Sequence, residues 1–130
     1  MTDKPEKSAL ERGRELTAKL APNMEPVLSE RYDELLPGMS ESLVEWAYGR
    51  QYARPGLDLK SRYIATIAAL TTLGGQTGPQ MKINVAAALK AGLTKYEIAE
   101  TIWHCSLYGG LPAAINALNA AIEVFEDQNI

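Results

Sequence analysis

Two long segments without Asp, Glu, Lys or Arg, at residues 63–81 and 101–122, constrain the fold of this 130-residue chain most strongly. Each segment approaches the ~20 residues that an apolar helix needs to span a bilayer. Both are interrupted by residues that end helices: Gly74, Gly75 and Pro79 in the first segment, and Gly109, Gly110 and Pro112 in the second. We therefore expect each segment to form two shorter helices that meet at a turn, and we expect no membrane span.

Signals for helix starts recur along the whole chain. Ser8 with Glu11, and Thr94 with Glu97, have the spacing of capping boxes, in which each side chain accepts a hydrogen bond from the backbone of the other residue. Asp58 is placed to cap a further helix. No segment shows the alternating, β-branched pattern of a half-buried strand. The sequence therefore predicts an all-α fold of six to seven helices.

Gly and Pro residues set the approximate limits of the expected helices, which are 8–20, 28–36, 40–52, 58–73, 79–91, 94–108 and 112–125. In the last helix, large apolar residues recur at helical spacing and predict a buried face: Ile115, Leu118, Ile122 and Phe125. The same helix carries alanines that suit close packing, either within the domain or between subunits: Ala113, Ala114, Ala117, Ala120 and Ala121.

The composition favours one compact cytoplasmic domain over residues 1–130. A chain of this length with 46% hydrophobic residues can bury a sizeable core. Its single Cys excludes an internal disulfide and is consistent with a reducing compartment, and residues 1–14 lack the apolar stretch of a signal peptide. The basic residues are scattered and total 13 against 16 acidic residues, so we expect no nucleic-acid partner.

The nearly charge-free helices expose little polar surface, which is unusual for a monomer. We therefore expect a homo-oligomer. The N-terminal helix, within residues 1–22, is a candidate arm for that assembly.

The helix opened by the second capping box carries the most chemically informative face. Glu97, Thr101, His104 and Tyr108 fall on one stripe at helical spacing. A carboxylate, an imidazole and a phenol one turn apart can relay or donate a proton. The alternative is that Glu97 completes only the capping box, while His104 and Tyr108 cover a helix surface or a subunit contact. His104 is the only His of the chain, so any imidazole chemistry must use it.

The lone Cys105 does not indicate thiol or metal chemistry. It has no second Cys for a dithiol cycle, and we expect it to fill the apolar core. A zinc site needs three or four protein ligands, and Cys105 lies on a different side of the helix from His104. We expect no bound metal.

Three groups of residues follow one another along the chain: Arg54-Pro55-Gly56-Leu57-Asp58; then Gly92-Leu93-Thr94 with Glu97-Ile98; then Tyr108-Gly109-Gly110 with Pro112-Ala113-Ala114 and Asn116-Ala117. Their order and spacing resemble the carboxymuconolactone decarboxylase family over about residues 52–125. The resemblance implies a small all-helical subunit with an alkyl hydroperoxidase D-like fold. It also implies a ring-like homo-oligomer, commonly a hexamer or trimer, with sites near subunit contacts.

This family has two chemical branches. The alkyl hydroperoxidase D branch uses a Cys-x-x-Cys followed by His, and the matching positions here are Thr77, Gln80 and Asn84. Without either thiol there is no nucleophile to reduce a peroxide, so this activity is excluded. The decarboxylase branch usually has Glu-Leu-x-x-His where this chain has Gln80 through Asn84, and an amide cannot supply a proton as an acid or an imidazolium can.

The resemblance to the decarboxylase branch implies a role for each candidate residue. Decarboxylation of a carboxymuconolactone needs no cofactor, because the unsaturated lactone itself accepts the electrons. Arg54 is then the residue that anchors a carboxylate, and His104 returns a proton to carbon. Hydrogen bonds to the oxyanion come from Tyr108, Gln80 and Asn84. The candidate substrate-binding residues are Glu97, Gln80 and Asn84.

Two functional hypotheses follow. The first is a cofactor-free carboxy-lyase that acts on a small carboxylated lactone or a related compound of aromatic catabolism. The second is a catalytically altered family member that serves as a binding or assembly protein. In the second case, Arg54 ties down carbonyls in a turn, and Gln80 and Asn84 form hydrogen bonds between helices.

Overall fold

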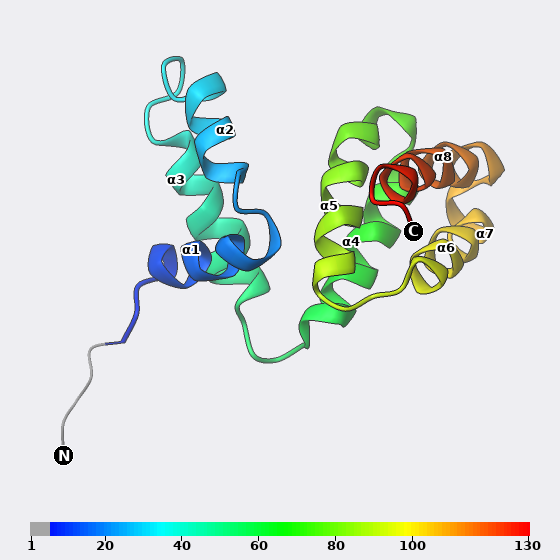
Figure 1. Ribbon diagram of the computed structural model, residues 1–130, viewed down its shortest axis with the longest axis horizontal. Helices are drawn as coiled ribbons and strands as arrows, with labels where there is room; N and C mark the ends of the chain where they lie inside the picture. The colour runs from blue at the N-terminus through cyan, green and yellow to red at the C-terminus, as the bar shows by residue number, and fades with distance from the viewer. Residues whose placement is uncertain (1–5) are drawn as a thin grey trace. The chain divides into compact units, whose positions relative to one another are not determined.

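The computed structural model describes residues 6–130, and these residues form helices and turns without any strand (Figure 1). The predicted all-α fold is therefore confirmed. The described chain forms two compact units, one that ends at Leu57 and one at Asp58–Ile130, and each is described by itself. The single domain expected over residues 1–130 stays a prediction. Of the candidate N-terminal arm at residues 1–22, residues 1–5 lie outside the described part of the chain.

The first unit contains four helical elements: α1 (Ala9–Leu20), α2 (Met24–Tyr32), α3 (Met39–Leu43) and the π-helical η1 (Val44–Tyr52), which continues directly from α3. The predicted capping box at the start of α1 is confirmed. The Glu11 N–H donates to Ser8 Oγ at 3.1 Å, and the Ser8 N–H donates to Glu11 Oε1 at 3.4 Å. These bonds satisfy two backbone donors that a helix start leaves without partners.

Close backbone contact joins α1 to η1. A Cβ atom at Gly13 would lie 2.5 Å from the carbonyl oxygen of Val44, and Gly13 and Gly49 are both buried. Only glycine allows two backbones to approach this closely. Around this crossing, the core of the unit contains Leu20, Val44 and Tyr48.

The second unit contains α4 (Leu59–Leu73), the short 3₁₀ turn η2 (Gly75–Thr77), α5 (Gly78–Lys90), α6 (Lys95–His104), α7 (Ser106–Gly109) and α8 (Leu111–Asp127). Asp58 caps α4 as predicted, because its Oδ1 accepts a hydrogen bond from the Ser61 N–H at 2.9 Å. The largest fully buried apolar side chains of this unit come from three helices that pack against α8: Tyr63, Ile67, Met81, Val85, Ile98 and Ile102.

The buried face of α8 differs from the predicted one. Ile115 and Ile122 are 46% and 44% exposed, whereas the buried residues are Ala114, Ala117, Ala120, Ala121, Val124 and Phe125. The prediction was right for Phe125 and wrong for the two isoleucines. Because α4, α5 and α6 all pack against α8, small side chains on the contact face allow the helices to approach closely.

Neither charge-free segment forms a continuous apolar helix. The first is divided by the η2 turn and the second at Gly110, as the glycines and prolines predicted. The second is divided once more at Cys105, which the sequence did not predict. Within residues 6–130, no helix combines the length and hydrophobicity that crossing a membrane requires.

Candidate functional site

The six predicted site residues are divided between the two units. Arg54 belongs to the first unit and the other five to the second, where they lie on three helices: Gln80 and Asn84 on α5, Glu97 and His104 on α6, and Tyr108 on α7. The structure brings two pairs of them together, His104 with Tyr108 and Gln80 with Asn84.

His104 and Tyr108 are neighbours on the surface. Their ring centroids lie 6.1 Å apart at an interplanar angle of 56°, and Tyr108 is 81% exposed. The imidazole is also exposed, so both polar rings are accessible to a small molecule. This arrangement retains the adjacency that the sequence spacing predicted and leaves the proton-bearing groups open to a ligand.

The helix that carries these rings is shorter than predicted. It ends at His104 instead of Tyr108, and α7 starts after a turn at Cys105. The Cys105 N–H donates to the carbonyls of both Thr101 and Ile102, at 3.2 and 3.1 Å, which tightens the last turn of α6. Cys105 itself is buried, with its Sγ donating to the Ala68 carbonyl at 3.8 Å.

Glu97 forms the predicted capping box. Its Oε1 accepts a hydrogen bond from the Thr94 N–H at 2.9 Å, and its own N–H donates to Thr94 Oγ1 at 3.1 Å. The bond from the Thr94 backbone is the main cause that lowers the pKa of Glu97, and the positive charge of Lys60 lowers it further. Glu97 is therefore a carboxylate at neutral pH, a state in which it accepts hydrogen bonds and does not donate a proton.

The two amides of α5 make their contact within one helix. Asn84 Nδ2 donates to the Gln80 carbonyl oxygen at 2.8 Å. This bond runs one turn back along α5, so it is not the hydrogen bond between helices that we considered as an alternative. The Gln80 side chain is exposed, and that of Asn84 is partly buried.

Arg54 lines an open cavity of about 610 Å³ in the first unit. Its backbone N–H donates to the Gln51 carbonyl at 3.1 Å in the turn that follows η1. The same cavity is lined by Arg12 from α1 and by Trp46 and Arg50 from η1. Sequence reasoning missed these three residues. Arg50 was recognisable from its position one helical turn before Arg54, whereas nothing in the sequence relates Arg12 to this region.

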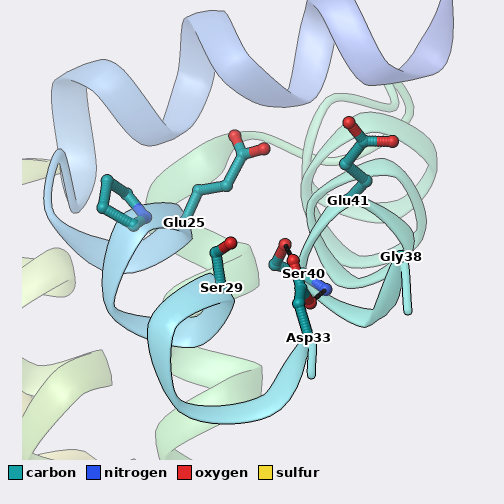
Figure 2. Close-up of a pocket in the computed structure, with 7 residues that line it drawn as sticks. Glu25, Ser29, Asp33, Gly38, Ser40 and Glu41 are labelled. Atoms are coloured by element: carbon teal, nitrogen blue, oxygen red, sulfur yellow. Dashed lines mark hydrogen bonds between the residues drawn. The ribbon is translucent and has the colours of Figure 1, made fainter. Parts of the chain in front are cut away.

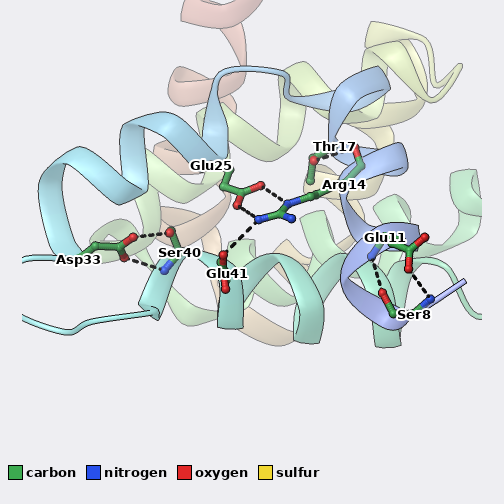
Figure 3. Close-up of polar contacts among 8 residues, drawn as sticks. All are labelled: Ser8, Glu11, Arg14, Thr17, Glu25, Asp33, Ser40 and Glu41. Atoms are coloured by element: carbon green, nitrogen blue, oxygen red, sulfur yellow. Dashed lines mark hydrogen bonds and ion pairs between the residues drawn. The ribbon is translucent and has the colours of Figure 1, made fainter.

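A second cavity of the first unit, of about 570 Å³, is lined by acidic and hydroxyl side chains between α2 and α3 (Figure 2). These groups already have partners within the protein (Figure 3). Arg14 of α1 donates to Glu25 at 2.8 Å and to Glu41 at 3.3 Å, and Asp33 accepts hydrogen bonds from the Ser40 N–H at 2.9 Å and Ser40 Oγ at 2.6 Å. These contacts link α1, α2 and α3, which gives the acidic residues a structural role.

No group of three or more His, Cys, Asp or Glu side chains within residues 6–130 is arranged to hold a metal ion. The acidic side chains of the cavity between α2 and α3 form no such group, because their carboxylates accept hydrogen bonds from Arg14 and Ser40. The six candidate site residues offer guanidinium, imidazole, phenol, amide and carboxylate groups.

Comparison with known proteins yields one family match and several relatives. The model of the carboxymuconolactone decarboxylase family matches residues 37–123. A relative from Paracoccus denitrificans, described as an uncharacterized 15.0 kDa protein in the nqo9-nqo10 intergenic region, is 38% identical over 120 residues, which are 92% of this chain and 90% of the relative.

Two other relatives are named as decarboxylases. The 4-carboxymuconolactone decarboxylase of Acinetobacter baylyi is 42% identical over 85 residues, or 65% of this chain. The nitrosuccinic acid decarboxylase npaB of Metarhizium robertsii is 32% identical over 91 residues, or 70% of this chain. The matched region spans 62% of the length of each of these two proteins.

Proposed function

Because the chain belongs to the carboxymuconolactone decarboxylase family, we propose that it is a cofactor-free carboxy-lyase that acts on a small carboxylated lactone or a related compound of aromatic catabolism. The observation that carries this proposal is the extent of the family match. Residues 37–123 include all six candidate site residues, from Arg54 to Tyr108. The two relatives named as decarboxylases support the same reaction class.

The proposed reaction breaks the bond between a carboxylate carbon and the substrate skeleton and releases carbon dioxide. The electron pair of that bond moves into the unsaturated lactone and forms a dienolate, so the substrate itself serves as the electron sink. Arg54 binds a substrate carboxylate through its guanidinium fork. Tyr108 donates a hydrogen bond to the dienolate oxygen, and the His104 imidazolium then protonates carbon.

The remaining candidates orient the substrate. The exposed Gln80 amide can donate hydrogen bonds to a carboxylate or a lactone oxygen. Asn84 has one amide hydrogen bonded to the Gln80 carbonyl, which leaves its second amide hydrogen and its oxygen for a ligand. Glu97, as an ionised acceptor, suits a hydroxyl group of the substrate.

An alternative proposal is a binding or assembly protein that has lost the chemistry of the family. The amides at Gln80 and Asn84 favour it, because neither supplies a proton. Under either proposal we place the protein in the cytoplasm, since its one Cys offers no disulfide.

Ultraviolet absorbance during incubation with 4-carboxymuconolactone tests the proposal. We expect the absorbance of the substrate to fall with wild-type protein, and we expect Arg54→Lys to raise KM. The lysine keeps the charge but loses the bidentate fork, so the expected increase is about tenfold. Lactone binding without turnover would support the binding-protein alternative instead.

A further inference from the structure

The cavity around Arg54 is positively charged. It is lined by three arginines, Arg12, Arg50 and Arg54, and no acidic residue is among its lining side chains. Glu45 offsets part of this charge, because its Oε1 accepts hydrogen bonds from Arg50 at 3.2 and 3.3 Å. Arg12 adds a guanidinium group that attracts anions, and a concave surface strengthens that attraction.

Arg12 brings a charge that no acid in the described chain neutralises. Its NH1 donates to the Lys7 carbonyl at 2.6 Å and its Nε to the Gly49 carbonyl at 3.4 Å, and both acceptors are neutral. A guanidinium has five N–H donors, so these two bonds leave donors for a ligand. They also restrain the side chain, which reduces the entropy that Arg12 loses when a ligand binds.

The backbone around Arg12 is held in place by the crossing of α1 and η1. Gly13, the next residue, lies against the Val44 carbonyl, and Gly49 lies against Ala9. Arg12 thus projects from the helix face that is closest to η1, beside the elements that carry Arg50 and Arg54.

Trp46 adds an apolar surface to the same cavity. Its side chain is 61% exposed although it lines the cavity together with the arginines. An exposed indole beside cationic groups suits a small organic anion, which offers both carbon atoms and charge. Inorganic anions would use the guanidinium groups and leave the indole unused.

We propose that Arg12 is a specificity-determining residue, which binds a second carboxylate of a ligand whose first carboxylate is bound by Arg54. The cavity then selects small dicarboxylates over monocarboxylates with the same carbon chain. This inference rests on the proposed function for the role of Arg54. Arg12 lies outside residues 37–123, so α1 supplies this selectivity from beyond the region that matches the family model.

Fluorescence of Trp46 provides a test that does not depend on turnover. The chain has two Trp, and Trp103 belongs to the second unit, so Trp103→Phe leaves Trp46 as the only indole. This protein is titrated with succinate and with butyrate, which share a carbon chain but differ by one carboxylate. We expect succinate to bind about fivefold or more tightly than butyrate, and less so at high salt.

Arg12→Gln should abolish the preference, so that succinate and butyrate bind about equally tightly, since it removes one charged hydrogen bond. Arg31→Gln is the matched control: it removes the same charge from the same unit, but Arg31 stacks over Tyr32 and does not line the cavity. We expect that control to keep the preference. A preference that persists in Arg12→Gln, or that is absent before mutation, would overturn the inference.

A second variant keeps the test decisive if Arg12→Gln loses its helical circular dichroism. Arg12→Lys keeps the positive charge but loses the planar fork of donors, so it should keep a smaller preference for succinate than the protein with Arg12. A preference unchanged by Arg12→Lys and by Arg12→Gln would overturn the inference.

Turnover of 4-carboxymuconolactone by the same proteins separates the two proposals. Turnover without a succinate preference would overturn the role of Arg12 and leave the proposed function standing. A succinate preference that depends on Arg12, in a protein without turnover, would support the role of Arg12 and contradict the carboxy-lyase.

Discussion

Gly49 lies so close to Ala9 that a Cβ atom added to Gly49 would come within 1.9 Å of the Ala9 carbonyl oxygen. No side chain can move aside to relieve this contact, because the neighbouring atom belongs to the backbone. The contact therefore fixes the distance between α1 and η1, and with it the position of Arg12 at the cavity.

Gly49→Ala should destabilise the protein by about 1–3 kcal/mol, because the added methyl group forces the two helices apart. Urea unfolding followed by circular dichroism measures this change. Gly56→Ala is the control, since nothing lies within 4 Å of a Cβ atom at Gly56. If both variants have the same midpoint as the wild type, the close crossing does not exist in solution.

Asp33 should contribute to stability in a pH-dependent way. Hydrogen bonds from the Ser40 hydroxyl and then from the Ser40 N–H lower the pKa of Asp33 below its usual 3.8. A carboxylate whose folded pKa is lowered stabilises the protein above the unfolded value, and that contribution is lost as the pH falls through the folded pKa. Asp33→Asn should thus lower Tm at neutral pH and lower it less at about pH 3.

Thermal scans of the wild type and Asp33→Asn across this range measure the effect. Glu30→Gln serves as the control, because Glu30 is exposed on the same helix. A difference in Tm between wild type and Asp33→Asn that stays constant with pH would contradict the role of the Asp33–Ser40 contact.

His104→Gln should lower kcat more than it raises KM. A proton donor acts mainly in the transition state, and general acid catalysis contributes about a hundredfold or more. The carboxymuconolactone assay gives both constants, and Glu100→Gln, an exposed change on the same helix, is the control. A kcat that remains within a few-fold of wild type would remove His104 from the mechanism.

Cys105→Ser should keep activity within about tenfold of wild type, because the thiol is a buried core group without a redox partner. The serine hydroxyl can make the same bond to the Ala68 carbonyl that Cys105 Sγ makes. Turnover and oligomeric state are measured together. Loss of activity in a correctly assembled variant would show that the thiol takes part in the reaction.

The protein should self-associate at micromolar concentration. The end of α6 and the segments that follow it expose large apolar side chains that water solvates poorly: Trp103 at 54%, Leu107 at 73% and Leu111 at 51%. Sedimentation velocity measures the mass, and Leu107→Glu should shift it toward the monomer. A monomeric wild type would contradict this prediction.

Helix starts were predictable from sequence because their hydrogen bonds connect residues three positions apart. The box of Thr94 with Glu97 and the cap at Asp58 are examples. The buried side of α8 was not predictable in this way. Ile115 fits a buried stripe by its spacing, yet the packing of α4, α5 and α6 selects the alanine side.

The residues of the candidate site also divide into those that depend on near neighbours in the sequence and those that depend on helix packing. Arg54 and His104 were proposed from short motifs and helical spacing, which depend on neighbours along the chain. Arg12 was missed because its position depends on how α1 crosses η1, and the residues that set this crossing, Gly13 and Gly49, lie far apart in the sequence.

The family match starts at residue 37, whereas the cavity around Arg54 is also lined by Arg12 of α1. A fragment that begins at residue 37 keeps η1 and Arg54 but lacks the helix that carries Arg12. Truncation at the limit of the shared region would therefore cut through the cavity and leave one side of it open. If Arg12 has the proposed role, transplanting α1 between related chains should transfer the preference for dicarboxylates without altering any residue of the shared region.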